Sequence, residues 1–202
     1  MLQIQALKAD GMAKTVSWQL QAGELWSLYG ASGSGKSQLL KSLADLVPNQ
    51  GEVHLQGRAR SAMSAPEWRR QVMYFAAETA WWLETVSEHF VSPPKEEVLQ
   101  SIGLSPSLLS QHPDQLSSGE KQRLALLRGL AFEPSVLLLD EISANLDPES
   151  TVQVEALIQS YLVEGERCAI WISHDRAQRE RLACPAFCLE MAQLYQGESD
   201  EH

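Results

Sequence analysis

Residues 30–37, with the sequence GASGSGKS, combine glycines, a lysine and a serine at the spacing of a phosphate-binding loop. They match GxxxxGK[ST] at every fixed position. The three glycines permit positive φ angles, so that successive backbone N–H groups point inward at phosphate oxygens. The Lys36 ammonium would neutralise the terminal phosphates of a nucleotide, and the Ser37 hydroxyl would bind the Mg²⁺ that bridges them. The alternative is a glycine–serine turn that binds nothing, which a full match between an expected strand and an expected helix disfavours.

Two adjacent carboxylates, Asp140 and Glu141, follow the apolar run Val136–Leu139. A carboxylate at this place can hold Mg²⁺ directly or through water, and its neighbour can act as a general base toward an attacking water. We assign the first role to Asp140 and the second to Glu141. Because strands often end in acidic residues simply where a polar loop begins, the pairing with the phosphate loop carries this argument.

Three short apolar runs and three helical patterns alternate along the chain. Each run has the length of a strand and is too continuously apolar for a sheet with one face in water, so buried parallel strands are expected. The expected strands are Leu25–Tyr29, Val136–Leu139 and Ala169–Ile172, and the expected helices are Ser37–Leu46, Glu120–Phe132 and Pro148–Val163. This alternation predicts an α/β fold with a parallel sheet.

Polar residues follow the same end of each expected strand. Gly30 follows the first, the two carboxylates follow the second, and residues 173–175 (SHD) follow the third. In open α/β sheets this carboxyl edge binds ligands, so one site is expected from three distant segments. Elsewhere we expect a short strand at Gly51–Gly57 and a small helical insert over about residues 78–116, a stretch interrupted by four prolines.

The composition is that of a globular domain with an acidic balance. The 202 residues are 44% hydrophobic and 21% charged, and 16 Lys and Arg against 26 Asp and Glu give a net charge of −10. This charge disfavours nucleic acid as a partner. No apolar stretch approaches the ~18 residues of a membrane span, so no direct membrane insertion is expected. The first residues lack the plan of a secretory signal, which predicts a cytoplasmic protein.

The three cysteines are an odd and sparse set, Cys168, Cys184 and Cys188. Their spacing to each other and to the histidines supplies no second half-site for zinc, so buried thiols are expected. Residues 197–202 are polar and acidic and are expected to form a disordered tail.

Residues Leu116–Glu120 (LSSGE) resemble the LSGGQ signature of the ATP-binding-cassette (ABC) ATPases. The resemblance extends over the carboxylate strand, over Ala144–Asp147 (ANLD), which is similar to the family's D-loop, and over the switch at residues 173–175. It implies a P-loop NTPase core with a parallel sheet, a small antiparallel β portion and a short helical subdomain. The expected domain is 1–196, with the helical insert at about 78–130 and an acidic tail at 197–202.

The resemblance also assigns roles to individual residues. The catalytic pair is Glu141 with His174, which would sense the γ-phosphate; the D-loop residue Asp147 would couple two sites, and Ser37 with Asp140 would hold Mg²⁺. The implied nucleotide-binding set is Gly30, Ala31, Ser32, Gly33, Ser34, Gly35, Lys36, Ser37 and Gln38.

The signature is expected to work across a dimer. Ser117, Ser118 and Gly119 precede a helix that we expect to begin near Glu120, so hydroxyls and free N–H groups there would form an anion site. In the family this site caps the γ-phosphate bound by the opposite subunit, which implies a homodimer with two ATP molecules between its subunits. Without the other motifs, an ordinary Ser/Gly helix cap would be the better interpretation.

The chain departs from the family pattern in two places. Alignment with the usual strand before the Q-loop puts Ala77 where the family has a glutamine ligand, and neither Glu78 nor Gln71 can be assigned its role. Residues 10–14 show no clear aromatic for stacking on adenine, so weak adenine selectivity with competition from GTP is expected. The neighbouring Trp81 and Trp82 are either core residues or part of the groove that receives a permease in this family.

These features favour the ATPase subunit of an ABC transporter, cytoplasmic and peripheral on the cell membrane, that powers a separate integral membrane permease. Within the family, the chain most resembles the FetA/YbbL-type iron-export subfamily, in its small size and in its sequence from the signature to the two carboxylates. The alternative is a soluble ABC ATPase of an assembly or remodelling complex, as in iron–sulfur scaffolds. A small-metabolite kinase ranks last, because it would need a lid and an acceptor pocket rather than the signature.

Overall fold

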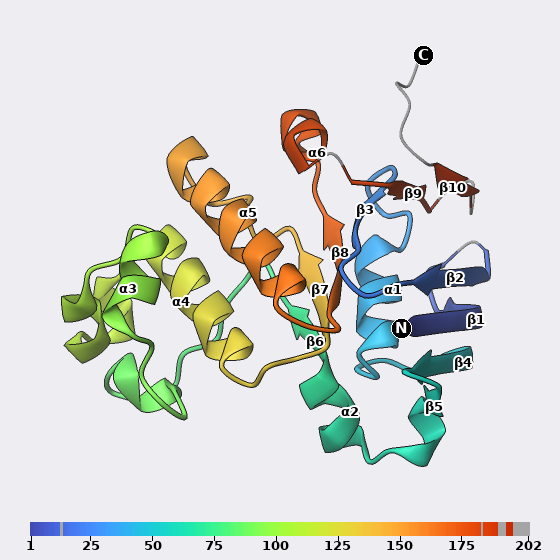
Figure 1. Cartoon of the computed structure of the whole chain (residues 1–202), viewed down its shortest axis with the longest axis horizontal. Helices are drawn as coiled ribbons and strands as arrows, with labels where there is room; N and C mark the ends of the chain where they lie inside the picture. The colour runs from blue at the N-terminus through green and yellow to red at the C-terminus, as the bar shows by residue number, and fades with distance from the viewer. Residues whose placement is uncertain (13, 183, 190–192, 196–202) are drawn as a thin grey trace.

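Among the described residues, six strands build a mostly parallel sheet, and a smaller antiparallel sheet of four strands lies beside it (Figure 1). The computed structural model describes residues 1–12, 14–182, 184–189 and 193–195. The larger sheet has the order β10-β9-β3-β8-β7-β6, in which β10 alone runs antiparallel to its neighbour, and the smaller has the order β2-β1-β4-β5. The strands are β1 (Leu2–Ala9), β2 (Val16–Leu20), β3 (Leu25–Tyr29), β4 (Asn49–Leu55), β5 (Arg58–Ala59), β6 (Val72–Phe75), β7 (Val136–Asp140), β8 (Cys168–Ile172), β9 (Ala186–Cys188) and β10 (Gln193–Tyr195).

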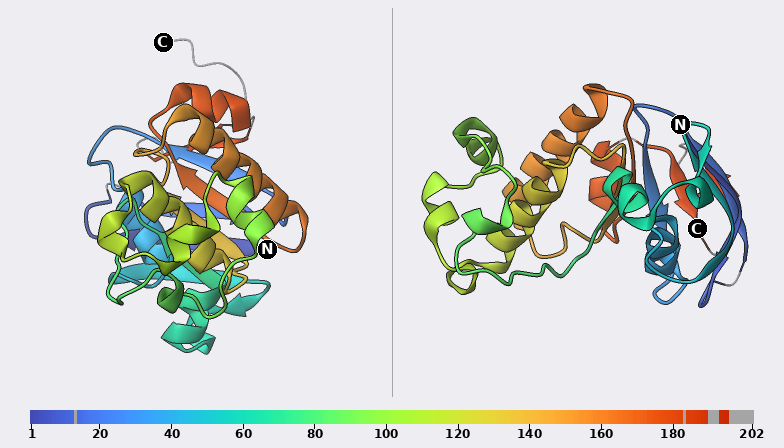
Figure 2. Two further views of the ribbon diagram at one scale, coloured as in Figure 1. Left: turned by 90° about the vertical axis from the view of Figure 1, so that its left-hand side faces the viewer. Right: turned by 90° about the horizontal axis from the view of Figure 1, so that it is seen from below.

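Helices separate the two sheets and cover the outer face of the larger one. Helix α1 lies between the sheets, and α5 lies on the opposite face of the parallel sheet (Figures 1 and 2). The α-helices are α1 (Lys36–Leu43), α2 (Ala65–Gln71), α3 (Glu96–Ser101), α4 (Ser118–Leu130), α5 (Pro148–Val163) and α6 (Arg176–Leu182). One buried core joins α1 to both sheets, and a second joins α4 and α5 to the other face.

The central strands are buried on both faces, as their continuous apolar sequences predict. All residues of β7 and β8 are buried, and β3 begins and ends where expected. The predicted α/β class is therefore confirmed. The expected strand end at Leu139 is one residue short, because Asp140 still pairs with Ile172.

Three expected helix boundaries, in two helices, are wrong by two or three residues. Helix α1 stops at Leu43 rather than Leu46, because Asp45 takes a φ of 57° that ends the helical path. Helix α4 begins at Ser118 and ends at Leu130, two residues before each expected boundary. Glu133, at φ 52°, turns the chain away toward β7. The strand expected at Gly51–Gly57 is β4, which begins at Asn49 and gives way to a turn after Leu55.

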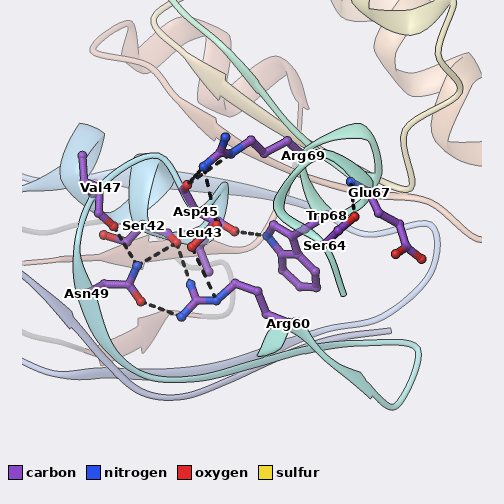
Figure 3. A network of polar contacts seen from close by, with 10 residues as sticks. All are labelled: Ser42, Leu43, Asp45, Val47, Asn49, Arg60, Ser64, Glu67, Trp68 and Arg69. Atoms are coloured by element: carbon purple, nitrogen blue, oxygen red, sulfur yellow. Dashed lines mark hydrogen bonds and ion pairs between the residues drawn. The ribbon is translucent and has the colours of Figure 1, made fainter. Parts of the chain in front are cut away.

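Side chains from the segment after β4 bind the C-terminal carbonyls of α1 (Figure 3). Arg60 donates to the carbonyl of Ser42 at 3.0 Å, and the Trp68 indole donates to that of Leu43 at 2.8 Å. Arg69 donates to the carbonyl of Asp45 at 2.6 Å. The last carbonyls of a helix have no partner within it, so these donors stabilise the end opposite to the phosphate loop.

The stretch around residues 86–116 contains one six-residue helix, α3, and three short 3₁₀ turns, and it packs against α4. Its core includes Val86, Leu99 and Ile102 beside Leu124 and Leu127 of α4. This lobe lies at the far end of the molecule from the antiparallel sheet (Figure 2). Within the part of the chain that the structure describes, no helix combines the length and apolarity that crossing a bilayer demands.

Two of the three cysteines, Cys168 and Cys188, are buried, and Cys184 is half-buried. Burial raises the pKa of the Cys168 thiol to about 12 and also raises that of Cys184. Among the described residues no cluster of His, Cys, Asp or Glu has the composition of a metal site. These thiols are therefore packing groups, while the expected tail at 197–202 lies outside the described residues.

Candidate nucleotide-binding and hydrolysis site

The phosphate loop connects the end of β3 to the start of α1. Gly30, Gly33 and Gly35 have φ angles of 146°, 79° and 94°, values that other residues rarely adopt. A Cβ on Gly35 would also lie 3.0 Å from the carbonyl oxygen of Gly11, so no side chain fits there. The buried Lys36 ammonium donates to the carbonyls of Gly30 and Ala31, each at 2.9 Å. The ammonium is therefore held inside the loop, where it would meet a bound phosphate.

A cavity of about 280 Å³ opens over this loop. It brings residues from the phosphate loop together with Glu141 and His174, which arrive from β7 and β8. The loop residues that line it are Ser32, Gly33, Gly35, Lys36, Ser37 and Gln38, and Gly11 lines it from the end of β1. Gly11 was not identified from the sequence. It has a φ of 84° in the turn after β1, and a single glycine outside a motif does not predict such an angle.

The two oxygens of the Asp140 carboxylate bind different donors. The Ser37 hydroxyl donates to Oδ1 at 3.1 Å, and the Tyr74 hydroxyl donates to Oδ2 at 2.6 Å. Burial, followed by this hydrogen bond, raises the pKa of Tyr74 well above its usual value. A hydroxyl and a carboxylate oxygen side by side at a phosphate loop are hard oxygen ligands that suit Mg²⁺. Tyr74 was missed because a tyrosine in a buried strand is usually a packing residue.

Glu141 and His174 contact each other at the mouth of the cavity. His174 Nε2 lies 3.0 Å from Glu141 Oε1, and both side chains are open to solvent. Glu141 has a φ of 53°, and this backbone conformation costs a residue with a Cβ of order 1–3 kcal/mol. Its amide donates to the carbonyl of Ile172 at 3.2 Å, which ties the turn after β7 to the end of β8. A carboxylate held in this way can accept a proton from water over the loop.

The signature residues open α4 but do not line this cavity. Ser117 is the N-cap, and both Ser117 and Ser118 are exposed. The expectation of free donors at Ser117 is wrong: Glu120 Oε2 accepts from its amide at 2.8 Å and from its hydroxyl at 2.7 Å. These bonds lower the pKa of Glu120. The helix therefore begins before Glu120, in a reciprocal capping arrangement that the SxxE spacing favours.

Asp147 lies beside the signature rather than in the cavity. It caps α5 by accepting from the Ser150 hydroxyl at 2.7 Å and from its amide at 2.9 Å, which lowers the pKa of Asp147. A Cβ on Gly119 would lie 3.4 Å from the carbonyl oxygen of Asn145. The segment between Glu141 and Asp147 therefore links the hydrolysis site to the start of α4 within one chain.

Ala77 and its neighbours place no amide in the cavity. Glu78 lines a separate groove, and the Gln71 side chain accepts from the Ser135 hydroxyl at 2.7 Å. The amide of Gln122 donates to the carbonyl of Ala76 at 3.0 Å and so ties α4 to the strand end. Neither candidate for the missing glutamine replaces it in this structure.

The separate groove, of about 380 Å³, lies between the segment after β6 and α4. Trp82 is 68% exposed there, so the interpretation that both tryptophans are core residues is wrong. The Arg128 guanidinium lies 4.6 Å and 5.2 Å from the ring centres of Trp81 and Trp82. His89 Nε2 accepts from the amides of Trp82 and Leu83, which holds the tryptophan segment in place.

Comparisons with known proteins agree with this geometry. A family model described as ABC transporter matches residues 13–144. The chain is 35% identical over 173 residues to the "Probable iron export ATP-binding protein FetA" of Escherichia coli (strain K12), covering 80% of this chain and 77% of that protein. It is 34% identical over 194 residues to the "Putative ABC transporter ATP-binding protein YjkB" of Bacillus subtilis (strain 168), covering 87% and 76%.

A solved structure has the same fold. It is described as a dimeric structure of a post-hydrolysis state of the ATP-binding cassette MJ0796 bound to ADP and Pi. Its TM-score is 0.76 at 21% identity, covering all of this chain and 97% of that one. With a family model over most of the chain and a relative above 30% identity, the chain belongs to the ABC transporter family and is an ABC-type ATPase.

Proposed function

We propose that this chain is a single nucleotide-binding domain, over residues 1–196, that drives a separate membrane permease by hydrolysing ATP between two copies of itself. Residues of about 78–130 form its helical subdomain. The observation that carries the proposal is the contact of Glu141 with His174 over the phosphate loop, 3.0 Å between Oε1 and Nε2. The contact supports the proposal because a carboxylate that can accept a proton and an imidazole that can orient it lie together at the cavity over the loop.

The residues of the site divide the work of hydrolysis. The loop amides and Lys36 bind the phosphates, and Ser37 with Asp140 would hold Mg²⁺, which neutralises charge on the phosphate oxygens. Glu141 accepts a proton from the attacking water, and His174 holds the Glu141 carboxylate in position. Each role matches a side chain that lines the cavity or binds one that does.

The exposed signature supports a nucleotide-bound homodimer. Ser117 and Ser118 face solvent at the N-terminus of a 13-residue helix, where an anion is favoured, and a phosphate bound there would take the place of Glu120 Oε2 as the acceptor for Ser117. In a head-to-tail pair, this helix end would cover the γ-phosphate bound by the other copy. The dimeric state described for the structurally similar cassette MJ0796 is consistent with this arrangement.

The groove at Trp82 is the proposed docking surface for the permease. It joins exposed aromatic area to the Arg128 cation, the residue types enriched in protein interfaces. Docking there would place the chain on the cytoplasmic face of the membrane. In this proposal all the assigned site residues act on the nucleotide, and cargo selection belongs to the permease. The name of the FetA relative supports metal export, with iron as the cargo.

The test of hydrolysis uses the purified chain and the Glu141→Gln variant. We expect ATP-dependent phosphate release from the wild type and a loss of about 10²-fold or more in the variant, with ATP affinity retained. The variant keeps the size of the side chain and removes its proton-accepting charge. A variant that turns over ATP at the wild-type rate would contradict the assignment of Glu141 as the base.

The test of the partner is copurification with the membrane protein encoded beside this chain. Trp82→Ala should reduce recovery of the complex, whereas Val163→Ala, which truncates an apolar side chain 84% exposed at the end of α5, should not. Recovery of soluble partners alone would favour an assembly ATPase of the iron–sulfur scaffold type and would overturn the transporter proposal.

A further inference from the structure

One part-buried hydrogen bond joins the turn that carries Glu141 to the helix that follows His174. The Ser143 hydroxyl donates to Oε1 of Gln178 at 3.1 Å. Ser143 lies two residues after Glu141, and Gln178 lies on α6, four residues after His174. Gln178 is fully buried and Ser143 is half-buried, so the bond is partly shielded from water.

The contact between Glu141 and His174 is itself weak, because it lies at the surface. Glu141 and His174 meet where both side chains are open to solvent, and exposed ion pairs contribute little to holding two segments together. Glu141 also has its unfavourable φ of 53°, which persists only where surrounding bonds hold the turn. Two other hydrogen bonds hold α6 but do not reach the turn that carries Glu141. Arg179 donates to the carbonyl of Ser173 after β8, and Arg181 donates to Glu155 of α5.

In the described segments of the chain, the Gln178 side chain leaves one buried hydrogen-bond donor unpaired, which is unfavourable for folding. Its Nε2 atom is buried and has no hydrogen-bond partner among the described residues. An unpaired buried donor is destabilising, and an apolar side chain of similar length would fill the same space without that penalty. The unpaired Nε2 atom is therefore a cost of having an amide here, and the oxygen of the same amide provides the acceptor for Ser143.

We propose that Ser143 and Gln178 are positioning residues, which set the distance between the turn after β7 and the start of α6 so that Glu141 and His174 meet over the phosphate loop. This inference rests on the proposed roles of Glu141 and His174 in hydrolysis. Neither Ser143 nor Gln178 lines the nucleotide cavity, so their effect falls on the chemical step rather than on ATP binding.

The test compares matched variants in steady-state ATP hydrolysis. Ser143→Val removes the donor. Ser143→Thr introduces a side chain of almost the same shape as valine but keeps the hydroxyl, so it is the matched control. Gln178→Met removes the acceptor at nearly constant volume. We expect kcat to fall about tenfold in Ser143→Val and Gln178→Met, with the Kd for ATP within twofold of wild type, and Ser143→Thr to stay within twofold in kcat.

Two further readouts separate positioning from a general structural role. The melting temperature of Gln178→Met should equal or exceed that of wild type, because the unpaired amide is gone. The double variant Ser143→Val with Gln178→Met should be no slower than either single variant, since both remove one bond.

The inference is overturned if Ser143→Val and Gln178→Met both keep wild-type kcat, or if Ser143→Thr is as slow as Ser143→Val. If Ser143→Val does not fold, the Gln178→Met variant decides alone. Wild type and Glu141→Gln are measured in the same assay, and equal hydrolysis rates in these two would contradict the proposed function. If Glu141→Gln loses activity as expected while Ser143→Val and Gln178→Met remain fully active, only the present inference is contradicted.

Discussion

Asp140 is held by two hydroxyls that come from different parts of the chain. Ser37 reaches one carboxylate oxygen from the start of α1, and Tyr74 reaches the other from β6. A carboxylate bound on both sides cannot rotate freely, so the oxygen that faces Ser37 keeps its orientation. Tyr74 therefore acts on the proposed metal site through Asp140, although it lines the neighbouring groove rather than the nucleotide cavity.

Tyr74→Phe should weaken the response to Mg²⁺ without removing nucleotide binding. The ring remains in β6 while Asp140 loses one of its two hydroxyl partners, so the Mg²⁺ concentration that gives half-maximal hydrolysis should rise about threefold to tenfold. ATP binding measured with EDTA present should be unchanged, because the loop amides and Lys36 are untouched. An unaltered Mg²⁺ titration in this variant would show that Tyr74 only packs.

Helix α1 carries the phosphate loop at one end and a network of donors at the other (Figure 3). Arg60 donates to the Ser42 carbonyl and, at 2.7 Å, to the Asn49 side chain, and its own side chain is only 17% exposed. A cation near the C-terminus of a helix is favoured by the helix dipole as well as by these bonds. The helix that presents Lys36 is thus secured from a segment more than twenty residues further along the chain.

Arg60→Ala should lower stability. Loss of the charge-assisted bonds to the Ser42 carbonyl and the Asn49 side chain costs about 1–2 kcal/mol, which corresponds to a fall of about 2–8 °C in melting temperature for a chain of this size. Arg70→Ala is the control, because Arg70 is exposed on α2. Differential scanning calorimetry at neutral pH distinguishes the two variants, and equal melting temperatures would contradict the capping role.

At the scale of the whole molecule, the proposed homodimer would bring the signature at the start of α4 and the phosphate loop into one site. Within one chain the signature at Ser117 does not line the cavity over Lys36. The segment from Glu141 to Asp147 connects the two regions, since Gly119 lies against Asn145. In the proposed arrangement, the exposed helix end that covers the phosphates therefore comes from a second copy.

Mixing two inactive variants tests this arrangement. Lys36→Ala removes the charge that binds the phosphates, and Ser117→Ala removes the exposed signature hydroxyl. In a mixed dimer, the Ser117→Ala copy supplies an intact phosphate loop and the Lys36→Ala copy supplies an intact signature, so one composite site is complete. We expect partial recovery of hydrolysis, up to about one-quarter of the wild-type rate from random pairing, against very low rates in each variant alone. No recovery at any mixing ratio would count against the shared site.

The continuous apolar runs of β3, β7 and β8 predicted a buried parallel sheet, because such runs fit strands covered on both faces. The glycine spacing of residues 30–37 predicted the phosphate loop, since its φ angles are a local property of glycine. Strand and helix ends were less certain, because they depend on single residues such as Asp45 and Glu133 that adopt positive φ.

Tertiary structure alone decided which side chains share a bond across the chain. Nothing in the local pattern indicates that Tyr74 reaches Asp140, that Gln178 reaches Ser143, or that Arg60 caps α1. These contacts join residues from 18 to 66 positions apart and exist only once the strands have paired and α1 has packed between the sheets. Local sequence determines the loop that binds phosphate, because backbone angles and hydrogen-bond donors are properties of short segments. The position of the groups that would act on the phosphate is a property of the packed fold.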